Sequence, residues 1–226
     1  VDLYFSEMIT PYIKGERARI VIKPIQDHLK LFAFFTNGKF IHRSFESLSM
    51  KARFKQNGSL IIEDTEIVGD GINGNKLFFG EFPLSAFWDE GIRDTAKLNL
   101  HFYLKNNNIN FITFFNDYVD SISNNGLLHL RMVGLLSNPK LSASILKLSN
   151  LSILLNKEKT IFKTPFTYLD GDIEFKNNKI TLSDASFLWK GEDSSNTENK
   201  FNLNGFVEVN DYDLFQLSNL NFLFDL

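Results

Sequence analysis

The chain has 226 residues and is 43% hydrophobic, which is enough apolar content for a folded core and argues against intrinsic disorder. Its net charge is −3 and no cluster of Lys and Arg stands out, so the charge gives no sign of nucleic-acid binding. Cysteine is absent, which excludes disulfides, thiol catalysis and Cys-ligated zinc.

The two ends of the sequence suggest a longer parent protein. The chain starts without Met and stops inside the apolar run LNFLFDL. No apolar run approaches the roughly 20 residues that span a bilayer, and no signal peptide opens the chain. We therefore expect a fragment whose membrane anchor or signal lies outside this sequence.

Alternation of apolar and polar residues runs through most of the chain and predicts β-strands that each bury one face. Asn, Gly and Asp separate these runs at intervals typical of hairpins. Two stretches, Pro11–Lys14 and Pro83–Trp88, are predicted as loops or short helical pieces. In chain order, the alternating apolar positions are Ala18, Ile20, Ile22; Leu48, Met50, Ala52, Phe54; Leu98, Leu100, Phe102, Leu104; Leu128, Leu130, Met132; Leu141, Ala143, Ile145; Ile180, Leu182; and Phe201, Leu203.

A glycine-rich loop follows the second of these runs. Residues Gly69 to Gly74 read GDGING and match the G-x-G-x-x-G string of dinucleotide sites, but a strand-like segment follows where such a site needs a helix. The acidic residues nearby do not have the spacing of an EF-hand. We interpret the segment as a hairpin connection in a solvated loop.

One segment has helical spacing instead. From Phe111, apolar residues follow at intervals of three, four, seven, eight and eleven up to Ile122, which is the spacing of one helical face. This predicts a short amphipathic helix over 110–123. It carries Asp117 and Asp120 and no Lys or Arg, so packing at a sheet end or edge is favoured over lying on a membrane.

A strand, turn and strand recur about 120 residues apart. The sequence FKQNGSLIIED (Phe54–Asp64) returns as FKNNKITLSD (Phe175–Asp184), and each copy is followed by a variable loop, the dipeptide NK, an alternating strand and a Gly. A matched order of elements indicates an internal repeat, and repeats stack into elongated structures. We predict a first β repeat over 1–96 and a second over 97–226 that includes the helix.

The stretch Gly126 to Leu155, GLLHLRMVGLLSNPKLSASILKLSNLSILL, resembles the repeating unit of the TamB family in the AsmA-like superfamily. The matching positions are Gly126, Gly134, Pro139, Leu141 and Asn150. The continuation YLDGDIEFKNNKITLSDASF resembles the next hairpin of that family, through Gly171, Ile173, Ile180, Leu182 and Asp184. One departure is Ser142, which stands where the family often has another Gly.

The resemblance implies an all-β chain whose elongated antiparallel sheet is rolled into an open apolar trough, a β-taco. It further implies a periplasmic protein of a diderm bacterium, anchored in the inner membrane and working with an outer-membrane barrel of the BamA or TamA type. The implied function is a non-enzymatic bridge for phospholipid passage between the membranes, in support of outer-membrane biogenesis. No cofactor is implied.

Elementary energetics are consistent with a trough. Exposing the roughly 30 methylenes of a two-chain lipid to water would cost on the order of 20 kcal/mol, at about 0.8 kcal/mol each. An apolar wall built from alternating strands would lower that barrier. The side chains expected to face the acyl chains are Leu98, Leu100, Phe102, Leu128, Leu130, Met132, Ile173, Phe175, Ile180 and Leu182.

Other functions stay open at this stage. The same alternation occurs in closed β-sandwiches, where the apolar face is core. The chain could instead be a scaffold that offers a sheet edge to nascent outer-membrane strands, or an extracellular β-rich adhesin or structural repeat. Enzymatic activity is not expected, because no catalytic motif occurs and the four His residues (His28, His42, His101, His129) are scattered.

Overall fold

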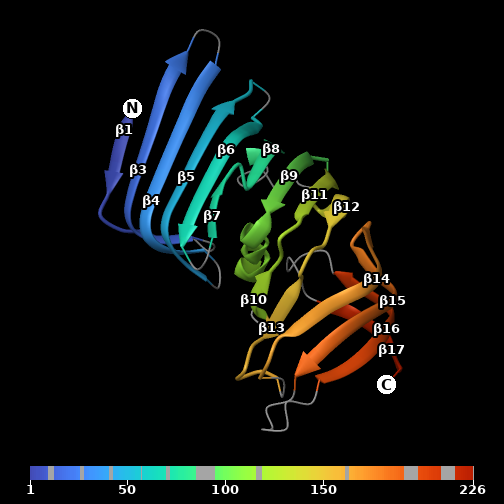
Figure 1. Ribbon diagram of the computed structural model, residues 1–226. Helices are drawn as coiled ribbons and strands as arrows, with labels where there is room; N and C mark the ends of the chain where they lie inside the picture. The colour runs from blue at the N-terminus through green and yellow to red at the C-terminus, as the bar shows by residue number, and fades with distance from the viewer. Residues whose placement is uncertain are drawn as a thin grey trace. The chain divides into compact units, whose positions relative to one another are not determined.

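The computed structural model describes residues 1–9, 13–25, 28–40, 43–56, 58–69, 72–84, 95–115, 119–160, 163–190, 198–209 and 217–225. The fold is mostly β, with large, open antiparallel sheets, as the alternation predicts (Figure 1). Contacts in space divide the chain into two compact units, Val1–Tyr103 with Leu130–Lys140, and Leu104–His129 with Leu141–Leu226. The predicted boundary between repeats at residues 96 and 97 stays a prediction.

The first sheet has the strand order β1-β3-β4-β5-β6-β8-β9-β11-β12, with β2 paired to β3 and β7 paired to β6. Strands β3 to β6 pair antiparallel in chain order, and β8 pairs antiparallel with β9. Its strands are β1 (Asp2–Phe5), β2 (Met8–Ile9), β3 (Ile13–Ile25), β4 (His28–Phe40), β5 (Arg43–Phe54), β6 (Leu60–Gly69), β7 (Ile72–Asn75), β8 (Phe78–Phe82), β9 (Lys97–Lys105), β11 (Leu127–Leu135) and β12 (Asn138–Lys147).

The second sheet, with the order β10-β13-β14-β15-β16-β17, belongs to the second unit. A ten-residue 3-10 helix, η2 (Asn106–Phe115), precedes it in the chain. The strands of this sheet are β10 (Val119–Ser123), β13 (Ser152–Leu155), β14 (Phe166–Lys176), β15 (Lys179–Lys190), β16 (Glu198–Val209) and β17 (Leu217–Asp225).

The predicted amphipathic helix over 110–123 is wrong in its second half. The helical segment ends at Phe115, and Val119–Ser123 is a strand that pairs antiparallel with β13. The side-chain oxygen of Asn110 accepts a hydrogen bond from the backbone N–H of Ile122 at 2.9 Å, which ties the helix to the strand. Sheet pairing has overridden the local helical spacing.

The turn regions agree in part with expectation. Ile13 and Lys14 lie in β3, so the predicted loop at Pro11–Lys14 is shorter than expected, and residues 85–88 of Pro83–Trp88 lie outside the described residues. The GDGING segment connects two paired strands, as predicted, because Gly69 lies opposite Ile72 in an antiparallel pair; Asp70 and Gly71 lie outside the described residues. No helix in the described part of the chain is long and apolar enough to cross a bilayer.

The repeated sequence forms the same pairings in both places. Phe54 pairs with Leu60 across the first turn, and Phe175 pairs with Ile180 across the second. The following strand then places a Gly at the equivalent position in each copy: Gly80 opposite Ile62, and Gly205 opposite Leu182. The two copies of the repeat therefore match in strand pairing as well as in sequence.

Both copies also contain an irregularity at the same point. The register shifts on β6 next to Asp64, where Lys51 pairs with Asp64 and Ala52 pairs with Ile62. It shifts on β15 next to Asp184, which has a positive φ of 49°. Such bulges bend a strand and increase its twist, so each copy carries a built-in bend after the hairpin.

Gly171 completes the bend on β14. Its φ is +112°, and an added Cβ would lie 2.4 Å from the backbone oxygen of Asp184. Only glycine accepts this conformation and this approach without strain. The positions Gly171 and Asp184, which carry the family resemblance, thus have a structural requirement that is independent of any function.

Candidate apolar binding surface

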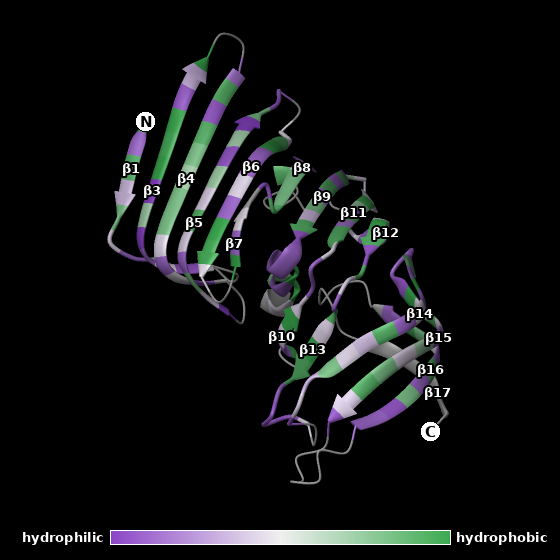
Figure 2. Cartoon of the chain, in the orientation of Figure 1, coloured by the Kyte–Doolittle hydropathy of each residue, from purple (hydrophilic) through white to green (hydrophobic). Residues whose placement is uncertain are grey.

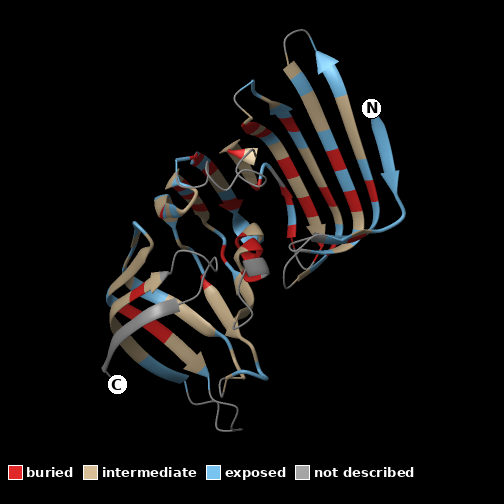
Figure 3. Ribbon diagram, turned by 180° about the vertical axis from the view of Figure 1, so that it is seen from behind, coloured by how far each residue is buried: buried red, intermediate tan, exposed pale blue. Residues whose placement is uncertain are grey.

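The first unit has a well-packed apolar face. On β3 to β6 one face holds many buried side chains, and cross-strand pairs such as Phe35 with Leu48 and Leu48 with Ile67 stack directly. Other apolar members of that face have intermediate exposure, namely Ile20, Ile22, Leu31 and Met50. Phe35 is 5% exposed and Ile67 is 0% exposed. Figure 3 shows these buried residues as bands across β4, β5 and β6. This part of the sheet therefore has an ordinary hydrophobic core.

The second unit has a different kind of apolar face, on β14 to β16. Registers place its members side by side: Ile173 opposite Leu182, and Phe175 opposite Ile180, which in turn pairs with Val207. We call it the β14–β16 apolar face. Its members are Phe166, Tyr168, Ile173, Phe175, Ile180, Leu182, Ala185, Phe187, Trp189, Phe201, Leu203 and Val207.

Most side chains of the β14–β16 apolar face are only half-buried. Among its members Ala185, Phe187 and Val207 are buried, and the other nine have intermediate exposure, as the mainly tan strands in Figure 3 show. Side chains on a bare sheet face shield one another laterally, whereas a second layer would bring them to the burial found in the first unit. The face is apolar without being sealed as a core.

Aromatic contacts organise one end of this face. The ring of Phe187 stacks on Phe201, with centroids 5.7 Å apart, and meets Tyr168 edge-on at the same distance. Phe166 meets Phe201 edge-on at 5.8 Å and stacks near Trp189. Offset and edge-on pairs of this kind stabilise a sheet surface beyond simple area burial.

The opposite face of the same strands is mostly polar, as the strand registers show. Figure 2 shows hydrophobic and hydrophilic residues interspersed along these strands. The polar face presents Thr167, Glu174, Lys176, Thr181, Lys200 and Asn202. Phe206 is an aromatic exception, and the ammonium of Lys179 covers its ring at 3.7 Å from the centroid. The two faces therefore differ clearly in their affinity for hydrocarbon.

The turn between β14 and β15 is hydrogen-bonded to β12 at one end of the β14–β16 apolar face. Asn177 and Asn178, both with positive φ, form the two-residue turn between β14 and β15. Asn178 accepts a hydrogen bond from the N–H of Leu141 at 2.6 Å and donates its own N–H to the oxygen of Leu141 at 2.8 Å. The hydroxyl of Ser142, the residue that departs from the family pattern, accepts the N–H of Asn177 at 2.8 Å.

Beside this turn lies an open cavity of about 340 Å³. Its lining includes Ala143 and Leu146 of β12, and Ile173 and Phe175 of the β14–β16 apolar face. That volume is at the low end of the roughly 300–1,000 Å³ of small-molecule pockets. The cavity extends the apolar face toward β12 and is too small to replace it as a surface for a two-chain lipid.

The structure separates the ten predicted lipid-facing residues into two groups. Phe102, Ile173, Phe175, Ile180 and Leu182 are half-buried, and the last four lie together on the β14–β16 apolar face. The other five are buried, Met132 being 8% exposed; they are Leu98, Leu100, Leu128, Leu130 and Met132. Contact of either group with acyl chains stays a prediction.

Sequence reasoning missed the aromatic half of the surface. Phe166, Phe187, Trp189 and Phe201 were not among the ten residues predicted to face lipid, yet they continue the face beyond the bulge at Asp184. The bulge inserts one extra residue into β15, so strict period-two counting from Leu182 puts Phe187 on the wrong face. The only sign of this aromatic half in the sequence is the high density of aromatic residues.

The described His and acidic residues do not form a cluster, and His42 lies outside the described residues. His101 stacks on Phe79, and the Nδ1 of His129 is hydrogen-bonded to the hydroxyl of Ser144. Asp64 pairs with Lys51 and accepts the N–H of Lys76. Within the described residues, no group of three or more His, Cys, Asp or Glu side chains could hold a metal ion.

Comparisons of the chain with protein-family models, with curated proteins and with solved structures gave no match.

Proposed function

We propose that this chain is a non-enzymatic carrier surface for phospholipid acyl chains, part of a periplasmic bridge between the inner and outer membranes. Its proposed partners are an outer-membrane barrel of the BamA or TamA type and, through an anchor outside this sequence, the inner membrane. The observation that supports the proposal best is the β14–β16 apolar face, where nine of twelve apolar members remain half-exposed opposite a polar face.

The physical argument concerns what a half-exposed apolar face can do. Each methylene that leaves water for such a face gains about 0.8 kcal/mol. The hydroxyl of Tyr168, a polar group on the face, is already hydrogen-bonded to the backbone oxygen of Gly171. A sealed core would bind nothing, and a polar face would not hold hydrocarbon. An open apolar face can accept a chain and also release it, which is what passage along a surface needs.

A photocrosslinking experiment tests the proposal. A photoreactive amino acid is placed at Leu182, on the apolar face, or at its neighbour Thr181, on the polar face, and lipids are identified by native mass spectrometry after expression in a diderm bacterium. Both side chains have intermediate exposure, so access to solvent is matched. A third probe at the buried Met132 reports on the other predicted group.

We expect phospholipid crosslinks from Leu182 and none from Thr181. A second pair of variants, Leu182→Arg and Thr181→Arg, should show lipid loss only in the first. A folded, lipid-free protein with no crosslink at Leu182 would overturn the proposal, and crosslinks from Leu182 to unfolded polypeptide would favour a scaffold for outer-membrane proteins instead.

A further inference from the structure

We propose that the outward face of β3, β4 and β5 in the first unit binds an anionic lipid surface. This face is separate from the β14–β16 apolar face and goes beyond the proposed function, because it concerns attachment to a membrane and not the holding of single lipids. Since the other face of these strands contributes the core residues Ala18, Ala33, Phe35, Leu48 and Ala52, the intervening side chains point outward.

We call this surface the basic-aromatic face. It consists of Arg17, Arg19, Val21 and Lys23 on β3, Lys30, Phe32 and Phe34 on β4, and Lys51 and Arg53 on β5. Six of these nine residues are cations and none is acidic, although the whole chain has a net charge of −3. The positive charge is therefore a local feature that composition conceals.

The cations are arranged in a row across three strands. Lys23 lies directly opposite Lys30, and Lys30 lies directly opposite Arg53. Like charges placed opposite one another across strands destabilise a sheet. Such a row costs the isolated protein free energy, and an anionic partner would remove that cost.

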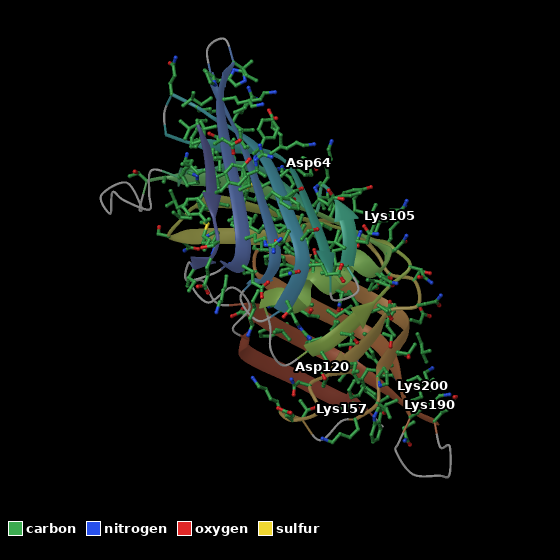
Figure 4. The ribbon with its side chains drawn as sticks, turned by 90° about the vertical axis from the view of Figure 1, so that its left-hand side faces the viewer. Asp64, Lys105, Asp120, Lys157, Lys190 and Lys200 are labelled. Atoms are coloured by element: carbon green, nitrogen blue, oxygen red, sulfur yellow. The ribbon has the colours of Figure 1, made fainter. Side chains whose placement is uncertain are left out.

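Neighbouring strands neutralise only half of the cations. Asp2 on β1 pairs with Arg19 at 2.8 Å, Asp64 on β6 pairs with Lys51 at 3.7 Å, and Glu63 pairs with Arg53 at 3.4 Å. Asp64, labelled in Figure 4, marks the β6 margin, where Glu66 opposite Ser49 adds one more acid.

The other three cations remain available. In the part of the chain that the structure describes, Arg17, Lys23 and Lys30 form no ion pair with an acid. All three lie on the same two strands, β3 and β4. The remaining positive charge is thus concentrated around the exposed aromatic side chains of β4.

Two of those aromatic rings lie unusually open to solvent. Phe32 is 36% exposed and Phe34 is 45% exposed, at positions between Val21 and Lys51 and between Arg19 and Ser49. Phe has no polar atom to favour water, so exposed Phe side chains among cations point to an occupant that is both apolar and anionic.

A membrane interface containing anionic lipids meets both requirements. Aromatic rings enter the boundary of the acyl chains while Lys and Arg reach the headgroups, and each cation near the surface strengthens binding by roughly 1 kcal/mol, which is about fivefold. Single-stranded nucleic acid also uses cations and aromatic rings, but a nucleic-acid-binding domain is expected to be basic as a whole, and this chain has a net charge of −3.

The test is co-sedimentation with vesicles of phosphatidylcholine, with or without 30% phosphatidylglycerol, at low and high salt. The test variant is Lys23→Glu with Lys30→Glu. The matched control is Lys97→Glu with Lys140→Glu, which changes the charge equally at two exposed lysines of the same unit. Phe34→Ser removes the more exposed ring without changing charge.

We expect the wild-type chain to bind the anionic vesicles and to bind less at high salt, since salt screens exposed charges. The test variant should bind at least about 30-fold more weakly, from about fivefold for each lysine removed, and the two added carboxylates should weaken binding further by repelling the anionic lipids. The control should bind like the wild type. Phe34→Ser should weaken binding at both salt concentrations.

Three results would overturn the inference: no vesicle binding by the wild type, equal losses in the test and control variants, or binding of an oligonucleotide with the same residue dependence but not of vesicles. Photocrosslinking of lipid at Leu182 tests the proposed carrier function and does not depend on vesicle binding. Failure of one proposal is therefore distinguishable from failure of the other.

Discussion

Replacing Leu128 and Leu182 by Ala, one at a time, tests whether the β14–β16 apolar face is open. Both residues are leucines in strands of the second unit, and both were predicted to face lipid from the same alternation. They differ in environment, because Leu128 is 5% exposed and Leu182 is half-buried. Any difference between the two variants therefore reports on what covers each side chain.

The expected losses follow from burial. Leu128→Ala removes a fully packed side chain and leaves a cavity, so it should lower the free energy of unfolding by about 3 kcal/mol. Leu182→Ala removes a side chain that only its lateral neighbours shield, with no enclosed cavity left behind. Its loss should be about 1 kcal/mol, from partial burial alone.

Urea unfolding of delipidated protein measures both values, followed by far-ultraviolet circular dichroism and by tryptophan fluorescence, to which Trp189 of the second unit contributes. Equal losses of about 3 kcal/mol would show that a layer of protein covers Leu182, and the argument for an open face would fail. Adding phospholipid should stabilise the wild type by mass action and the Leu182→Ala variant less.

Three further predictions concern the elements that shape the sheets. Gly171→Ala should destabilise the second unit by about 3 kcal/mol in urea unfolding, because its φ of +112° disfavours Ala and its Cβ would meet the backbone of Asp184; a loss below about 0.5 kcal/mol would contradict the bend. Asn178→Gly should cost about 1–2 kcal/mol by removing a hydrogen-bond acceptor from the β14–β15 turn while keeping its φ accessible, and an unchanged midpoint would show that the turn does not hold β12. The hydrogen bond from Arg19 keeps the pKa of the Asp2 carboxyl below its usual value, so Arg19→Gln should raise that pKa in an NMR titration. The small stability that this pair adds is present above the unfolded pKa of Asp2 and is lost as pH falls through the folded value; an unchanged titration would mean that the pair does not form in solution.

The fold class was accessible from the sequence because strand periodicity is local. Side chains alternate between faces wherever the backbone is extended, so runs such as Leu98 to Leu104 identify strands without knowledge of their neighbours. Hairpin turns are local as well, and the two copies of the repeated sequence predicted turns that the structure contains at Lys55–Ser59 and Asn177–Asn178.

The helix prediction failed because its evidence was local and its competitor was not. Apolar spacing from Phe111 to Ile122 fits one helical face, but Val119–Ser123 forms a strand in the structure. The deciding interactions are the pairing of that strand with β13, some 30 residues away, and the bond from Ile122 to Asn110. The window over 110–123 that suggested a helix contains Asn110 and Ile122 but not β13, so it could not show the strand pairing.

The sequence by itself determined that most of this chain is extended, where its hairpins turn and which side chains share a face within each uninterrupted strand. Tertiary structure decided what lies against each face. Leu128 and Leu182 are both apolar positions of alternating runs, yet one is buried and the other is half-exposed. The physical reason is that alternation records the difference between two sides of one strand, whereas burial depends on strands and bulges that are distant in the sequence.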